Sequence, residues 1–184
     1  MGFATDKVLF GYLPEYERIA AELGPAARVL ELGVAEGESL RLWQHLFPDG
    51  QITGVDCADG SVWPEGTVKV LASHDSPVLP GLLDGPYGLI VDDGCHVGPV
   101  VRRSFDLLWP LVRPGGYYVV EDWQVSLRDA DGPGEKWGAR WGPDMLRAAE
   151  SFLPLLDRRG GECDSVTYRY GMVIIHKNRT PVER

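Results

Sequence analysis

The sequence is poor in cysteine, and its cysteines do not have the spacing of a disulfide framework or a zinc site. Cys57, Cys95 and Cys163 are odd in number and scattered along the chain. Disulfide scaffolds and zinc sites need cysteines in characteristic sets, so neither is predicted. We expect three reduced thiols, as is usual in the cytoplasm.

Basic clusters and long apolar runs are also missing. The formal net charge is -9, and lysines and arginines gather nowhere in the sequence, whereas nucleic-acid-binding proteins usually present a basic face. No apolar run is long enough to span a bilayer, and the first twenty residues lack the basic and apolar parts of a secretion signal. We therefore expect a cytoplasmic protein that binds a small molecule, without a nucleic acid or a membrane as partner.

What the sequence does contain is the composition of one globular domain. It has 184 residues, of which 44% are hydrophobic and 24% charged. Apolar segments rich in β-branched residues alternate with segments of helical periodicity. The apolar residues expected to face inward are Leu40, Trp43 and Phe47 in one helical segment, Val101, Phe105 and Leu108 in a second, and Met145, Ala149, Phe152 and Leu156 in a third. Strands are predicted at 27–32, 51–56, 67–72, 87–93 and 114–122, helices at 14–23, 37–47, 78–83, 98–112 and 143–156, and a hairpin at 164–177. Residues 123–142 are predicted to form a substrate loop, 1–25 a cap segment and 178–184 a frayed tail.

This alternation predicts an α/β, doubly wound, mostly parallel sheet that ends in an antiparallel hairpin. Ligands of such sheets bind beyond the carboxyl ends of the strands. The acidic residues that end several of these strands therefore face one crevice.

The turn after the first strand is rich in glycine. In "VLELGVAEGESL", Gly33 and Gly37 let the backbone approach a ligand closely, although their spacing is not that of the G-x-G-x-x-G dinucleotide fingerprint. A turn that merely needs positive φ is the alternative interpretation. Asp56 ends the next strand, where a carboxylate accepts two short hydrogen bonds well.

Four acids end two later strands, namely Asp92, Asp93, Glu121 and Asp122. Neighbouring strands lie roughly 4.8 Å apart. Two like charges about 5 Å apart repel by about 3 kcal/mol at an effective dielectric near 20. A divalent ion, Mg²⁺ or Mn²⁺, removes this repulsion and suits oxygen ligands. Alternatively, the acids diverge toward separate partners.

His96 follows the first acidic pair and is a candidate base, because an imidazole can accept a proton near neutral pH. The alternative is a structural hydrogen bond at a helix start. We expect His45 and His176 to be structural. The loop tryptophans Trp123, Trp137 and Trp141 either line an acceptor pocket or pin the loop to the body.

The glycine turn resembles motif I of class I S-adenosylmethionine-dependent methyltransferases, which have a Rossmann-like fold with a seven-stranded sheet. The resemblance implies that Glu31 contacts the cofactor and that Asp56 accepts from both ribose hydroxyls. The "SHDS" stretch is predicted to meet the adenine through Asp75, although His74 and Asp75 are equally compatible with a solvated turn.

The segments "DDGCH" and "SFDLLWPLVRPGGYYVVEDW" resemble the metal-dependent sugar O-methyltransferases of macrolide tailoring, of the mycinamicin and macrocin type. The similarity extends from about residue 28 through the hairpin. It implies that Asp93, Glu121 and Asp122 bind magnesium, that His96 is the base and that Asp92 faces the cofactor. Cys95 stands where the family often has serine.

The sequence hypothesis is therefore Mg²⁺-dependent methylation of a hydroxyl on a natural product, in which Asp93 and His96 are catalytic. The alternatives are a catechol-type O-methyltransferase, a nicotinamide-dependent oxidoreductase and a non-catalytic binding module. The macrolide enzymes carry a large N-terminal domain, whereas this chain has a short segment with Phe3, Phe10 and Tyr12. We expect these aromatic residues to be exposed, which is compatible with a homodimer.

Overall fold

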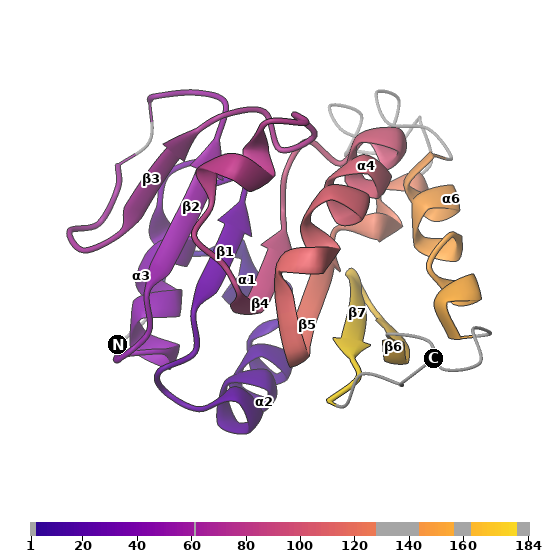
Figure 1. The fold of residues 1–184 in the computed structure, drawn as a ribbon, viewed down its shortest axis with the longest axis horizontal. Coiled ribbons are helices and arrows are strands. Elements are labelled where there is room, and N and C mark those ends of the chain that lie inside the picture. The colour runs from indigo at the N-terminus through magenta and orange to yellow at the C-terminus, as the bar shows by residue number, and fades with distance from the viewer. Residues whose placement is uncertain (1–2, 61, 128–143, 157–162, 180–184) are drawn as a thin grey trace.

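A seven-stranded sheet of order β3-β2-β1-β4-β5-β7-β6 forms the centre of the molecule (Figure 1). The computed structural model describes residues 3–60, 62–127, 144–156 and 163–179. Neighbouring strands are parallel from β3 to β5 and antiparallel in the pairs β5·β7 and β6·β7. The strands are β1 (Val29–Leu32), β2 (Ile52–Asp56), β3 (Val68–Leu71), β4 (Tyr87–Asp92), β5 (Val112–Glu121), β6 (Cys163–Arg169) and β7 (Met172–Lys177). The predicted doubly wound sheet with its final hairpin is confirmed.

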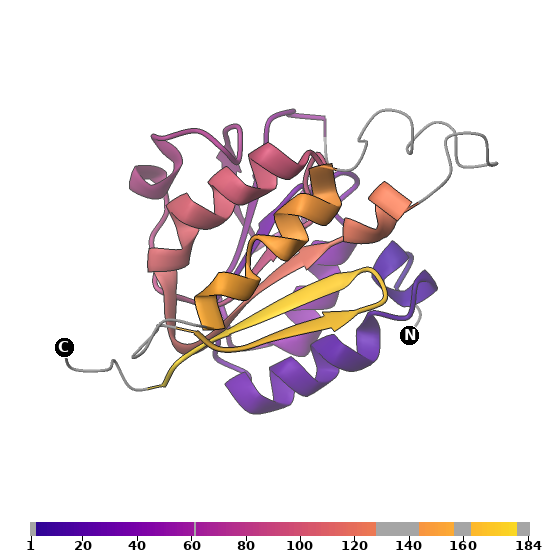
Figure 2. The ribbon, with the colours of Figure 1, turned by 90° about the vertical axis from the view of Figure 1, so that its right-hand side faces the viewer.

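Helices cover both faces of the sheet and enclose two apolar cores. Side chains of α4 and α6 pack into one core, and those of α2 and α3 into the other. Figure 2 shows α4 and α6 on one side of the sheet and α2 on the opposite side. The α-helices are α1 (Asp6–Leu9), α2 (Leu13–Leu23), α3 (Glu38–Leu46), α4 (Gly98–Leu108) and α6 (Asp144–Glu150). Short 3-10 helices are η1 (Leu79–Leu82), η2 (Trp109–Leu111), η3 (Trp123–Leu127) and η4 (Leu153–Leu156).

The apolar stripes predicted for two helices are confirmed. Leu40 and Trp43 of α3, with Phe47 just after it, are buried, as are Val101, Phe105 and Leu108 of α4. Strand β4 is buried on both faces along its whole length, as expected for a central strand with continuous apolar sequence. The two cores therefore hold β4 rigidly, with its carboxyl end at the site described below.

Three local predictions need correction. The segment predicted as a helix at 78–83 forms the 3-10 helix η1, in which Pro80 stands at the start. The helix predicted to end at 156 stops at Glu150, because Pro154 cannot continue its hydrogen bonds, and η4 follows. Leu156, predicted to face inward, is 47% exposed.

The segment predicted as a substrate loop begins with the 3-10 helix η3, and its residues 128–142 lie outside the described ranges. The N-terminal aromatic residues also differ from the expectation of exposure. Phe10 is exposed, but Tyr12 is fully buried in the core beside α2 and α3.

Cys57, Cys95 and Cys163 are free thiols. In the part of the chain that is described, we find no helix with the length and apolar character needed to cross a membrane.

Candidate active site

A cavity of about 790 Å³ opens at the carboxyl ends of β1, β2 and β4. Its wall combines the turn after β1, the end of β2 and the loop between β4 and α4. The N-terminal segment before α2 closes another side. The lining residues used below are Thr5, Asp6, Gly33, Val34, Ala35, Asp56, His74, Asp93, Gly94, Cys95 and His96.

The turn between β1 and α3 is packed tightly against the neighbouring loop. Gly33 has φ +84°, and a Cβ at this position would overlap the carbonyl oxygen of Asp93. Gly37, at the N-cap of α3, has φ +82°, and a Cβ there would overlap the carbonyl oxygen of Val62. Both positions therefore require glycine for close approach as well as for backbone conformation.

Asp56 lies at the cavity wall beside this turn. Its Oδ2 accepts hydrogen bonds from the backbone N–H groups of Val34 (3.0 Å) and Ala35 (3.2 Å), and its Oδ1 from Ala58 N–H (2.9 Å). Burial works to raise the pKa of Asp56, but these backbone donors outweigh it and lower the pKa. An ionised carboxylate is thus fixed where the sequence predicted a contact with the ribose.

Glu31 ends up beneath this region rather than on the cavity wall. It is fully buried, and its Oε2 accepts a hydrogen bond from Ser39 Oγ at 2.6 Å. Its Oε1 lies 3.3 Å from Lys7 Nζ. The structure therefore places Glu31 as a support for the start of α3 and as a partner of a buried lysine.

His74 lines the cavity, whereas its neighbour Asp75 accepts a hydrogen bond from Ser73 Oγ (2.6 Å) in the local turn. The His74 ring lies against Gly94, where an added Cβ would overlap the ring, and its Nδ1 is 3.8 Å from Asp92 Oδ1. Burial tends to lower the pKa of His74, but Asp92 and Cys95 outweigh it and raise the pKa to about 10. His74, rather than Asp75, is the residue of this stretch that reaches the cavity.

Strand register separates Asp92 from Asp93 and Glu121. Asp92 pairs with Val120, so the residues that follow, Asp93 and Glu121, lie side by side and point to the other face of the sheet. Asp92 is 1% exposed and accepts a hydrogen bond from Tyr118 OH at 3.0 Å. It does not line the cavity, and it lies behind His74.

A buried lysine that the sequence analysis missed lies among the acids. The Nζ of Lys7 in α1 is 2.6 Å from Asp93 Oδ2 and 3.2 Å from Glu121 Oε2, and it also contacts Glu31. The Lys7 side chain is 0% exposed. Burial tends to lower the pKa of Lys7, but the three carboxylates outweigh it and raise the pKa, so that Lys7 stays charged.

Two tyrosines complete the partners of the acids on β5. Tyr16 OH donates to Glu121 Oε1, so both oxygens of Glu121 are bound, and this carboxyl is 1% exposed. Burial raises the pKa of Glu121 in spite of Lys7 and Tyr16. Tyr12 OH donates to Asp122 Oδ1 at 2.6 Å, and Gln124 Nε2 donates to the same oxygen at 3.0 Å.

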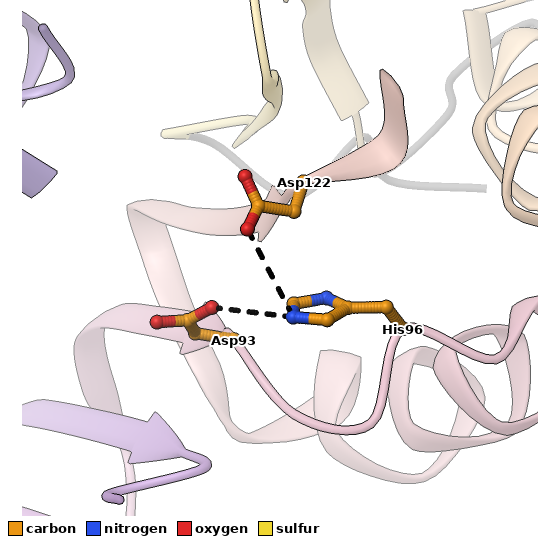
Figure 3. A group of neighbouring side chains, drawn as sticks. All are labelled: Asp93, His96 and Asp122. Carbon is orange, nitrogen blue, oxygen red and sulfur yellow. Dashed lines mark ion pairs between the residues drawn. The ribbon is translucent and has the colours of Figure 1, made fainter. Parts of the chain in front are cut away.

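Asp93, His96 and Asp122 point toward one another at the open side of this network (Figure 3). His96 Nε2 lies 3.9 Å from Asp93 Oδ1 and 3.9 Å from Asp122 Oδ2. One ligand atom from each of the three lies within 4.8 Å of the others, and among the described residues this is the group that meets the geometry of a metal site. The two carboxylate oxygens suit a hard divalent cation such as Mg²⁺ or Mn²⁺.

Two of the three described residues other than glycine that have positive φ belong to this group, and the third is Ala35 (φ +46°) in the turn after β1. His96 has φ +51° and Asp122 has φ +57°, values that cost about 1–3 kcal/mol for a residue other than glycine. A hydrogen bond from Asp122 N–H to Gly171 O (2.6 Å) holds one of these conformations. Strain of this kind persists where surrounding contacts impose it, and it clusters at functional sites.

The sequence of this chain is similar to those of known methyltransferases. The methyltransferase-domain family matches residues 30–123. The mycinamicin VI 2''-O-methyltransferase of Micromonospora griseorubida is 39% identical over 129 residues, which are 61% of this chain and 32% of that enzyme. The 8-demethyl-8-alpha-L-rhamnosyl tetracenomycin-C 2'-O-methyltransferase of Streptomyces olivaceus is 42% identical over 182 residues, which cover 86% of this chain and 46% of that enzyme.

Solved structures agree with these relatives. The MycE methyltransferase from the mycinamycin biosynthetic pathway, in complex with Mg, SAH and mycinamycin VI, superimposes with a TM-score of 0.75 at 27% identity, and the match covers 97% of this chain and 50% of that chain. The chain thus spans from about a third to about half of the length of these relatives. The sequence resemblance to the macrolide sugar O-methyltransferases is confirmed. The family match, the sheet order and the cavity at the strand ends lead to one conclusion: the chain belongs to the methyltransferase-domain family.

Proposed function

We propose that the chain transfers a methyl group from S-adenosylmethionine to a hydroxyl oxygen of a small-molecule acceptor, in a reaction that needs a divalent ion. The observation that carries the proposal is the meeting of Asp93, His96 and Asp122 beside the cavity that Asp56 and the glycine turn line. S-adenosylmethionine supplies a methyl group on a positively charged sulfur. The divalent ion supplies positive charge that makes a bound hydroxyl more acidic.

The cofactor side of the site uses backbone and one fixed carboxylate. Gly33 and Gly37 give the turn its shape, and Asp56 is positioned to accept hydrogen bonds from ribose hydroxyls. His74 takes the place at the wall that the sequence analysis gave to Asp75, and Asp92 orients it from behind. The cavity of about 790 Å³ is in the range of pockets that bury a ligand of this size.

Charge balance favours an ion at the open side of the acidic network. One ammonium, that of Lys7, contacts the carboxylates of Glu31, Asp93 and Glu121, and burial raises the pKa of all three acids in spite of it. Asp122 adds a further acid at the mouth. Two such charges about 5 Å apart still repel by about 3 kcal/mol at an effective dielectric near 20. A divalent ion at this position would offset the negative charge that the Lys7 ammonium does not balance.

We assign the direct metal contacts to Asp93 and Asp122. Each has one oxygen that faces His96 across the open side, at 3.9 Å from Nε2. Glu121 was also predicted as a ligand, but Lys7 and Tyr16 bind its two oxygens. Its role in this proposal is to hold Lys7 next to Asp93.

His96 is proposed as the base. Its Nε2 points to the space between Asp93 and Asp122 (Figure 3), so an acceptor hydroxyl bound beside an ion held there would lie next to this nitrogen. As the bond from the acceptor oxygen to the methyl carbon forms, the bond from that carbon to the sulfur of S-adenosylmethionine would break, so that S-adenosylhomocysteine leaves and the hydroxyl proton passes to His96 Nε2. The ion held by Asp93 and Asp122 would make the hydroxyl more acidic, which eases this proton transfer. His96→Ala should therefore lose turnover but keep its affinity for Mn²⁺, whereas a ligand role predicts loss of both.

The acceptor class is proposed from the relatives. The mycinamicin and tetracenomycin enzymes are named for methylation of sugar positions, so a sugar hydroxyl of a glycosylated natural product is the favoured acceptor. Incubation with S-adenosylmethionine and Mg²⁺, followed by mass spectrometry, should show the gain of one methyl group on glycosylated acceptors. A gain on catechols alone would favour the catechol-type activity instead.

A thermal-shift measurement distinguishes the enzyme from a non-catalytic binding module. S-adenosylmethionine should raise the melting temperature, because a ligand that binds only the folded state stabilises it. Without any shift, with or without Mg²⁺, the proposed cofactor site is refuted. A shift combined with no methylation across the acceptor panel would favour the binding module.

A further inference from the structure

Three side chains from one N-terminal segment bind the acids of the site. Lys7 of α1, Tyr12 at the N-cap of α2 and Tyr16 of α2 contact Asp93, Asp122 and Glu121, respectively. We call Lys7, Tyr12 and Tyr16 the N-terminal clamp. All three side chains are buried, although none belongs to the sheet whose strand ends carry the acids.

The N-terminal clamp binds one oxygen of each proposed ligand and leaves the other toward His96. Lys7 Nζ contacts Asp93 Oδ2 at 2.6 Å, while Asp93 Oδ1 faces His96. Tyr12 OH donates to Asp122 Oδ1 at 2.6 Å, while Asp122 Oδ2 faces His96. Figure 3 shows the two oxygens that are turned toward the imidazole.

We propose that Lys7 and Tyr12 are positioning residues, which fix the rotation of the Asp93 and Asp122 carboxylates so that one oxygen of each is presented to the ion. This inference rests on the proposed metal-dependent function. It adds that part of the affinity for the ion comes from the N-terminal segment with Lys7 and Tyr12, although this segment provides no atom that binds the ion. Partners that orient metal ligands typically change metal affinity by 10–100-fold when they are removed.

The same contacts couple the ion to the docking of the segment. Helix α1 has four residues, and the apolar side chains of Val8, of Leu9 and of Phe10 at its C-cap are exposed, Leu9 by 79%. Its contacts with the acids of the site are those of Lys7 Nζ, and the hydrogen bond from Lys7 N–H to Thr5 Oγ1 (3.4 Å) caps the start of α1. Because coupling between two binding events is reciprocal, an ion that fixes the carboxylates also stabilises the docked segment.

Tyr12→Phe tests the positioning role without changing charge. The ring stays in its buried place, and the variant loses the hydrogen bond that Tyr12 OH donates to Asp122 together with the longer one that it accepts from Gln124 Nε2 (3.3 Å). We expect Mn²⁺ affinity, measured by titration with electron paramagnetic resonance on the protein without acceptor, to fall about tenfold. This is the lower end of the range, because Gln124 still donates to the same oxygen at 3.0 Å.

The matched control is Tyr117→Phe. Tyr117 is also buried and also donates to a carboxylate, Glu22 Oε2 at 2.5 Å, but that acid lies on α2 away from the site. Its Mn²⁺ affinity should stay within about twofold of the unmodified protein. The melting temperatures of both ion-free variants show whether a lost hydrogen bond alone explains the change in affinity.

Amide hydrogen exchange provides a second readout, which does not depend on any substitution. Mg²⁺ should slow amide exchange in residues 5–16. The exchange rates in β7 beyond residue 172 should stay unchanged. The positioning role would be overturned if Tyr12→Phe and the unmodified protein had equal Mn²⁺ affinities, or if Mg²⁺ did not change exchange in residues 5–16. Either result would leave the proposed metal-dependent function intact. If the unmodified protein bound no Mn²⁺, the metal role in the proposed function would fall, and this inference with it.

Discussion

The two halves of the site are built in different ways. On the side of β1 and β2, the cavity wall is mainly backbone, in which Gly33 packs against Asp93 O and the N–H groups of Val34 and Ala35 fix Asp56. At the ends of β4 and β5, side chains bind side chains, as Lys7 and Tyr12 hold Asp93 and Asp122. The first half should therefore tolerate side-chain changes that preserve the backbone, whereas the second should be sensitive to the loss of single atoms.

The largest effects should come from the side-chain half. His96→Ala removes the proposed base, and Asp93→Ala removes an acid that Lys7 and the ion share. A positioned base contributes about 10²–10⁴-fold, so kcat for the methylation of a glycosylated acceptor should fall by at least 100-fold in each variant. Calorimetry should show that both variants still bind S-adenosylmethionine. Activity retained by Asp93→Ala would refute the metal role.

In the backbone half, the largest effect should follow from adding one methyl group. Gly33→Ala combines a left-handed conformation, which costs about 1–2 kcal/mol, with an overlap against Asp93 O. We expect a loss of about 3 kcal/mol in the free energy of unfolding, measured in urea. Gly11→Ala is the matched control, because Gly11 has φ +78° with nothing within 4 Å of the added Cβ, and it should lose only about 1–2 kcal/mol. Equal losses would show that the close approach has no energetic weight.

A smaller and pH-dependent effect is expected where the two halves meet. The pKa of His74 is raised to about 10 by Asp92 and Cys95 against the effect of burial, from about 6.5 in the unfolded chain. The stabilisation is therefore complete below pH 6.5, and it is lost as the pH rises from 6.5 to 10. His74→Gln should cost about 2 kcal/mol at pH 6 and progressively less toward pH 10. A difference in unfolding free energy that is independent of pH would contradict this origin.

The backbone half could be predicted from the sequence because its signals are local. The glycine turn and Asp56 lie at the ends of successive strands, and strand ends can be located from apolar periodicity. His74 and Asp75 are adjacent, so sequence alone could not decide which of the two side chains turns toward the cavity. The predicted strands, the hairpin and the stripes of α3 and α4 followed from the same periodicity.

The side-chain half could be predicted only in part. The pairing of Asp93 with Glu121 depends on the register of β4 and β5, which places Asp92 on the other face. Lys7 is separated from Asp93 by 86 positions and from Glu121 by 114, and no periodicity signals contacts of that range. From sequence alone, Lys7 would be predicted to lie at the surface, because lysines are almost never fully buried unless they are paired with an acid. The pairing partners became visible only when the strands were placed side by side.

The most direct test of the account is anomalous diffraction from crystals of the protein grown with Mn²⁺ and S-adenosylmethionine. The account predicts one anomalous peak bonded to Asp93 Oδ1 and Asp122 Oδ2, with Lys7 still on Asp93 Oδ2 and His96 turned toward the peak. Carboxylates contacted only by Lys7, the tyrosines and water, with Mn²⁺ absent from the space between them, would contradict it.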